Sequence, residues 1–139
     1  MVKYMNNQSP RLKRKNEGIK GSVFTFFSTA SAVGKTVLAV NYAADLAERG
    51  YKVCLADLDL QFGDVCNYLG ITPEKTFFNY YDQDEDKRDT SLCMTETQFG
   101  FDVLAAPLEV DEGFIIDAET IVQAIHQLES RGELDKLPP

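Results

Sequence analysis

The triplet Gly34-Lys35-Thr36 constrains the fold of this 139-residue chain more than any other feature. It stands between residues 22–27, which are apolar on both faces as a buried parallel β-strand should be, and residues 35–49, whose apolar side chains recur at helical spacing. At such a strand-to-helix turn the backbone N–H groups point toward an anion, and a lysine and a hydroxyl suit a phosphate and its Mg²⁺. The pattern predicts a phosphate site in an α/β fold.

A pair of carboxylates follows the next expected strand. Gly50 ends the helix, residues 52–56 have the apolar character of a second strand, and Asp57 and Asp59 come directly after it. In open α/β sheets the ligand crevice lies at the carboxyl ends of the strands, which is where the phosphate loop opens. We therefore expect Asp57 and Asp59 to lie on the same side of the sheet as Lys35.

Local signals predict four more elements in the rest of the chain. They are a short helix over 64–69 stopped by Gly70, a helix begun by Thr72-Pro73 and running to Tyr81, a strand over 101–106 ended by Pro107, and a helix over 118–128 capped by Asp117.

Two candidate sites have simpler explanations. Residues 114–117, Phe-Ile-Ile-Asp, superficially match an apolar strand that ends in a functional aspartate, but the residues before them make a poor buried strand and those after them are helical. We therefore assign Asp117 to the helix cap. His126 is the only histidine, and because no second metal ligand or nucleophile lies near it in the sequence, we expect no functional role for it.

Composition limits the class of protein. The chain is 44% hydrophobic and 26% charged, which fits one soluble domain. Its three cysteines lack metal-like spacing, and reduced thiols in a cytoplasm are the simplest explanation. No apolar run approaches the roughly 20 residues of a membrane-spanning helix, and the N-terminus lacks the apolar core of a signal peptide. We expect a cytoplasmic protein.

Charge is unevenly distributed along the chain. The net charge is −8, yet residues 1–20 contain six basic side chains and one acid. The acidic remainder argues against a general nucleic-acid surface. We interpret residues 1–21 as a flexible basic linker and residues 22–139 as the folded domain. The RLKRK segment of the linker could also bind an acidic partner, lipid headgroups or nucleic acid. The run DQDEDKRD at 82–89 is expected to be a solvated loop, because it lacks the glycine and spacing of a calcium loop.

These segments together resemble a known family. The stretch STASAVGKTVLAVNYAADLAERGYKV followed by DLDLQFGDVCNYLG resembles the MinD/ParA group of deviant Walker A ATPases. The segment DLDLQFGDV and the later segment FDVLAAP are most similar to those of its pilus-assembly branch, the CpaE/TadZ proteins. The likeness covers about residues 22–128. It implies a three-layer fold of the P-loop NTPase type, with a parallel sheet flanked by helices.

The resemblance also implies site residues for ATP and Mg²⁺. Lys35 would contact the terminal phosphates, the Thr36 hydroxyl would bind Mg²⁺, and Asp59 would hold the attacking water and the Mg²⁺ shell. Asp57 matches the first aspartate of the family signature, for which a supporting role at the metal is implied. The residues implied to cradle the phosphates are Ser31, Ala32, Val33, Gly34, Lys35, Thr36 and Val37.

The sequence departs from the family pattern in ways that affect hydrolysis. Ala30 replaces the signature lysine, which in the family reaches the partner's nucleotide across a dimer, and Ser31 and Ala32 replace glycines. By analogy with arginine fingers, loss of such a cation costs roughly 10³ to 10⁵ in rate. The family's later strand, with its aspartate and Thr-Pro-Pro that sense the γ-phosphate, has no counterpart after residue 128, so we expect an incomplete, truncated domain.

Three functional hypotheses follow from the resemblance. The first is an ATP-binding dimer that localises or assembles a pilus or secretion machine, in the cytoplasm or at a cell pole, with weak or no hydrolysis. The second is an active P-loop ATPase that cycles between dimer and monomer. The third is a degenerate interaction domain that binds no nucleotide. Ala30 and the absent γ-phosphate sensor favour the first.

Overall fold

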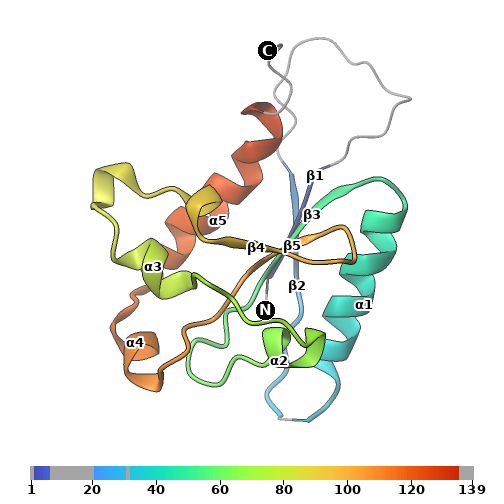
Figure 1. The fold of residues 1–139 in the computed structure, drawn as a ribbon, viewed down its shortest axis with the longest axis horizontal. Helices are drawn as coiled ribbons and strands as arrows, with labels where there is room; N and C mark the ends of the chain where they lie inside the picture. The colour runs from blue at the N-terminus through green and yellow to red at the C-terminus, as the bar shows by residue number, and fades with distance from the viewer. Residues whose placement is uncertain (1, 7–20, 31, 135–139) are drawn as a thin grey trace.

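The computed structural model describes residues 2–6, 21–30 and 32–134 and contains one mixed sheet (Figure 1). The strands lie in the order β2-β1-β3-β5-β4. β3 and β5 are parallel, β1 is antiparallel to both of its neighbours, and β4 is antiparallel to β5. The strands are β1 (Val2–Asn6), β2 (Ser22–Thr25), β3 (Lys52–Ala56), β4 (Met94–Glu96) and β5 (Asp102–Leu104).

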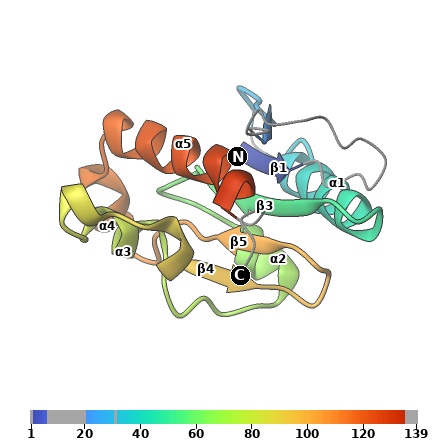
Figure 2. The same ribbon diagram turned by 90° about the horizontal axis from the view of Figure 1, so that it is seen from above.

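Helices cover both faces of this sheet. α1 packs on one face and α3 and α5 pack on the other, so that three layers are visible in Figures 1 and 2. This confirms the predicted α/β class, with a sheet that contains parallel strands. The helices are α1 (Lys35–Glu48), α2 (Val65–Leu69), α3 (Phe77–Tyr81), α4 (Val110–Ile115) and α5 (Ala118–Leu134), with the 3₁₀ turns η1 (Glu85–Lys87) and η2 (Thr90–Leu92).

β3 is the centre of the core because both of its faces are buried. Val53 and Leu55 belong to the apolar cluster under α1, whereas Cys54 and Ala56 belong to the cluster under α3 and α5. Successive side chains of a strand point to opposite faces, so a run without polar residues is required here. Full burial of a side chain such as that of Leu55 contributes about 1.5–3 kcal/mol.

The predicted helix after the phosphate loop is confirmed. α1 buries a stripe of side chains at helical spacing, and Gly50 follows its end with a φ of 89°, the left-handed conformation that favours glycine. The N–H of Gly50 donates to the carbonyl of Ala47. The buried stripe consists of Ala39, Val40, Ala43 and Leu46. These contacts hold the N-terminus of α1 at one end of the sheet.

The expectation that the first strand is buried between parallel neighbours is wrong. β2 pairs only with β1 among the described strands, and it does so in the antiparallel direction. Ser22, Phe24 and Thr25 are exposed and Val23 is half-buried. An edge strand lacks a neighbour on one side, so the apolar sequence that predicted burial is left partly open to solvent.

Part of the expected linker is also structured. Residues 2–6 form β1, which lies between β2 and β3, where a flexible segment is predicted for residues 1–21. Strand pairing with two partners is a non-local interaction that a short polar sequence does not reveal. Residues 7–20 lie outside the described part of the chain, so for them the linker stays a prediction.

The helix predicted to begin at Thr72-Pro73 begins later, at Phe77. Thr76 caps α3: its side chain accepts a hydrogen bond from the N–H of Phe78, and the Asn79 side chain accepts one from the N–H of Thr76. This reciprocal capping box pairs the N–H groups of Thr76 and Phe78, which have no carbonyl partner in the first turn of α3. The short helix before it is predicted correctly, because α2 ends at Gly70.

Elsewhere the predicted elements are largely confirmed. β5 covers the core of the strand predicted at 101–106, and residues 110–115 form a helix rather than a strand. Asp117 begins α5 by accepting a hydrogen bond from the N–H of Thr120 at 2.8 Å. Where the structure describes the chain, it contains no helix that is both long and apolar enough to span a bilayer.

Candidate functional site

The phosphate loop connects β2 to α1 and ends in a left-handed residue. Gly34 adopts φ 87° and ψ 17° at the N-cap of α1, and no side chain caps this helix. The first N–H groups of an α-helix have no partners within the helix, and together with the helix dipole they favour an anion. Lys35 and Thr36 are the first two residues of α1, so a cation and a hydroxyl flank these donors.

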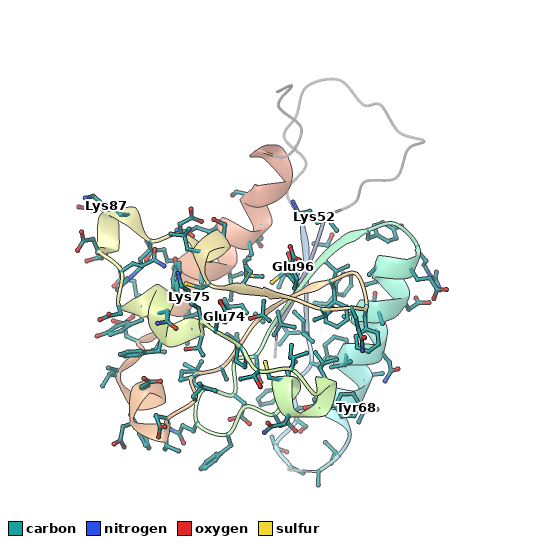
Figure 3. All side chains as sticks on the ribbon, in the orientation of Figure 1. Lys52, Tyr68, Glu74, Lys75, Lys87 and Glu96 are labelled. Atoms are coloured by element: carbon teal, nitrogen blue, oxygen red, sulfur yellow. The ribbon has the colours of Figure 1, made fainter. Side chains whose placement is uncertain are left out.

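A cavity of about 600 Å³ opens over this helix N-terminus. It brings Lys35 and Thr36 together with Asp59, as the sequence predicts. Its wall also contains side chains for which no site role is predicted, including the exposed aromatic rings of Phe62 and Tyr68. Figure 3 shows Tyr68 on α2, beside the start of α1. The full lining consists of Ala32, Val33, Gly34, Lys35, Thr36, Val37, Asp59, Phe62, Asp64 and Tyr68.

Ala32 occupies a conformation that suits glycine. Its φ is 57°, and it is the one non-glycine residue with a positive φ in the described part of the chain. The loop therefore still uses positive φ at a position where the family has glycine. Holding an alanine in the left-handed region lowers the stability of the fold by about 1 kcal/mol or more.

Replacing Ala32 by glycine is expected to leave stability unchanged or to raise it by up to about 1 kcal/mol. Glycine removes the steric cost of the left-handed conformation but has greater entropy in the unfolded chain. The control Ala44→Gly, in the middle of α1, should lose about 1 kcal/mol. Urea denaturation of both variants measures the difference, and an equal loss in both would exclude a left-handed Ala32.

The two predicted aspartates lie in different environments. Asp59 borders the cavity, and its Oδ1 accepts a hydrogen bond from the N–H of Phe62 at 3.2 Å. Asp57 is buried, and its two carboxylate oxygens accept from the N–H groups of Asp59 and Val65, each at 3.2 Å. It borders a separate cavity of about 300 Å³. This arrangement fits a supporting role for Asp57 better than direct contact with a metal.

Burial raises the pKa of Asp57 to about 6, although the N–H groups of Val65 and Asp59 lower it. The folded state therefore holds this proton more tightly than the unfolded chain, where the pKa is 3.8. A raised carboxyl pKa contributes stability that is present at low pH and is lost as pH rises through about 6.

The Asp57→Asn variant should accordingly gain stability relative to the wild type as pH rises. Between pH 5 and pH 7.5 the difference in unfolding free energy between the two proteins should move by about 1 kcal/mol in favour of the variant, because only the wild type loses a proton over this range. Urea denaturation at both pH values tests this. A difference that does not change with pH would show that Asp57 keeps an ordinary pKa.

A third carboxylate, Asp64, contacts the phosphate loop directly. Its Oδ1 accepts a hydrogen bond from the Thr36 hydroxyl at 2.6 Å. The sequence assigned Asp64 only to the start of a short helix, and the contact joins residues 28 positions apart. The only local signal for a site role of Asp64 is its position in the sequence, shortly after Asp57 and Asp59.

Other predicted features of the site stay outside the cavity. Ser31 lies outside the described residues, and Ala30 is exposed but does not line the cavity. Within the described ranges no three histidine, cysteine or carboxylate side chains converge to form a metal site. Mg²⁺ commonly takes one or two protein ligands and completes its shell with water and substrate phosphates, so Thr36 and Asp59 still fit it.

Comparison with known families identifies the domain. Residues 24–134 match the model of the CobQ/CobB/MinD/ParA nucleotide binding domain. The chain belongs to this family. The match covers the phosphate loop, both aspartates of the DLD sequence and all of α1 to α5, and it confirms the MinD/ParA resemblance at the level of the family.

Two curated proteins are similar over part of the chain. A probable plasmid-partitioning protein ParA of Thermus thermophilus is 33% identical over 91 residues, which is 63% of this chain and 27% of that protein. The antiactivator FleN of Pseudomonas aeruginosa is 40% identical over 60 residues, which is 43% of this chain and 21% of FleN. The chain thus spans about a quarter of the length of these relatives.

The fold is similar to that of a solved enzyme. Cobyrinic acid a,c-diamide synthase from Mycobacterium smegmatis, solved with a bound ATP analogue and magnesium and also with ADP and magnesium, aligns with a TM-score of 0.59. The alignment covers 77% of this chain and 46% of the synthase at 22% identity. At that identity the likeness shows the shared fold.

Proposed function

We propose that this chain binds Mg-ATP in the cavity over α1 and acts as the nucleotide-binding part of a MinD/ParA-type protein. The observation that carries the proposal is the convergence of the uncapped α1 N-terminus, Lys35, Thr36 and Asp59 on one cavity of about 600 Å³. The synthase of similar fold was solved with an ATP analogue and magnesium, which supports the choice of ligand.

Each group has a distinct task in this proposal. The N–H groups of the loop and the Lys35 ammonium neutralise phosphate charge, and the Thr36 hydroxyl and Asp59 hold Mg²⁺. When bound, Mg²⁺ neutralises charge on the terminal phosphates. The hydrogen bonds that Asp57 accepts from the N–H groups of Asp59 and Val65 suit it to hold the turn that carries Asp59.

We further propose that hydrolysis is weak. Ala30 stands where the family has its signature lysine, and its methyl group cannot stabilise the charge of a transition state. The finer assignment follows the resemblance of DLDLQFGDV and FDVLAAP: a CpaE/TadZ-type homodimer that binds pilus or secretion assembly proteins near a cell pole. An active ATPase that cycles between dimer and monomer is the second candidate, favoured by the 33% identity to the partitioning protein.

Calorimetry separates these functions when it is combined with a phosphate-release assay. Titration with ATP and with ADP, each in the presence of Mg²⁺, should show binding at one site per chain. Binding with little phosphate release supports the first function, and rapid release supports the cycling ATPase. No heat of binding with either nucleotide would reject both and leave an interaction domain that binds no nucleotide.

A further inference from the structure

Asp64 stands at a helix cap without capping the helix. It occupies the N-cap of α2, yet its side chain accepts no hydrogen bond from that helix. An aspartate at this position usually accepts from the second or third N–H group of the helix. Here Asp57 takes over part of that task, because its Oδ2 accepts from the N–H of Val65, the first residue of α2.

The carboxylate of Asp64 turns toward the phosphate loop instead. It accepts the Thr36 hydroxyl proton at 2.6 Å, within the short range of hydrogen bonds to charged acceptors. Both residues line the cavity in which Lys35 lies. Asp57 therefore supports α2, and Asp64 is left available to contact α1.

This bond determines what the Thr36 oxygen can offer. A hydroxyl has one proton to donate and two lone pairs with which to accept. Because the proton is directed to Asp64, the lone pairs of Thr36 Oγ1 are left for a cation in the cavity. The negative charge of Asp64 also attracts a cation to the part of the cavity near Thr36, whereas the positive charge of Lys35 repels one.

Asp59 does not duplicate this arrangement. Its Oδ1 accepts from the N–H of Phe62 within the turn after β3. Among the described side chains, Asp64 is the carboxylate for which a hydrogen bond to Thr36 is found. The two acids therefore approach the cavity with different partners, one within its own turn and one on α1.

We propose that Asp64 is a positioning residue that orients the Thr36 hydroxyl for Mg²⁺, and this inference rests on the proposed function. Partners of metal ligands typically change metal affinity by about 10- to 100-fold when they are removed. The consequence is specific: Asp64 should matter for nucleotide binding only when Mg²⁺ is present.

The test is calorimetry of ADP binding to the full chain, in EDTA and over a series of Mg²⁺ concentrations. Asp64→Ala should raise the Mg²⁺ concentration that gives half of the maximal affinity gain by about 10- to 100-fold. ADP affinity in EDTA should stay within about twofold. Asp64→Asn keeps an oxygen that can accept from Thr36, so its shift should be smaller.

A charge-matched control is Asp86→Ala. Asp86 is exposed in η1 and does not line the cavity. The loop that contains it is joined to α5 by a hydrogen bond from Arg88 to Gln123. If Asp64→Ala shifts the Mg²⁺ dependence no more than this control, the proposal is overturned. A loss of ADP affinity in EDTA as well would show a structural role and would also overturn it.

A double-mutant cycle tests whether Asp64 acts through Thr36. In a Thr36→Ala background, Asp64→Ala should add less than about a twofold change in Mg²⁺ dependence, because the group it orients is gone. Additive effects would overturn the proposal. If the wild type binds no ADP under any condition, the proposed function fails, whereas binding that is indifferent to Asp64→Ala rejects only this inference.

Discussion

Replacing Lys35 by alanine is expected to abolish the stabilisation of this protein by Mg-ATP. A ligand present at one hundred times its Kd adds about 2.7 kcal/mol to the free energy of unfolding, or about 10 °C in Tm for a chain of this size. Lys35 lies in the first turn of α1 and borders the nucleotide cavity. Without its charge, phosphate binding would depend on the backbone N–H groups and Mg²⁺, with no side-chain cation of the loop to neutralise the phosphates.

Thermal unfolding with and without saturating Mg-ATP measures this effect. The control is Lys87→Ala, which removes the same charge from an exposed side chain. Figure 3 shows Lys87 on the side of the molecule away from α1, so this variant should keep the full Tm shift with Mg-ATP. The unliganded variants should melt within a few degrees of the wild type. An unchanged nucleotide shift in Lys35→Ala would contradict the assignment of the cavity to phosphate.

Replacing Gly63 by alanine is expected to destabilise the fold by about 1–3 kcal/mol, the usual cost of forcing a methyl group into a packed site. A Cβ at this position would lie 2.3 Å from the Cβ of Ala106 and 2.7 Å from Oδ2 of Asp57. It would also lie 3.0 Å from the carbonyl oxygen of Asp59. The turn that carries Asp59 would have to move, so nucleotide affinity should fall together with stability.

A rescue variant makes the prediction about Gly63 specific. Gly63→Ala combined with Ala106→Gly removes the shortest of the three contacts and should recover part of the lost stability. Ala106→Gly alone should lose roughly 1 kcal/mol or less, as a substitution that only deletes a methyl group. Urea denaturation of the four proteins gives the coupling energy. Additive losses would show that the two residues do not meet.

Local signals in the sequence predicted the phosphate loop because its chemistry is contiguous. Gly34, Lys35 and Thr36 lie side by side in the chain, after a continuous apolar run and before a helix with clear periodicity. Gly50 and Gly70 predicted helix ends for the same local reason. The start of α3 was misplaced because two threonines could cap a helix, and only the hydrogen bonds of Thr76 choose between them.

The partners of β2 could not be predicted in the same way. Its sequence is apolar enough for a buried strand, but its exposure depends on which strands lie beside it. The insertion of residues 2–6 between β2 and β3 is a long-range pairing, and β-propensity depends strongly on such context. Burial of β2 therefore could not be inferred from its apolar residues alone.

The sequence by itself determined the family, the phosphate loop and the aspartates after β3, because each is written in residues that are close together in the chain. Only the tertiary structure decided that Asp57 is buried as a support for α2 and that Asp64 contacts Thr36. The physical reason is that side chains 28 positions apart meet only after α1 and α2 have packed at the same end of the sheet.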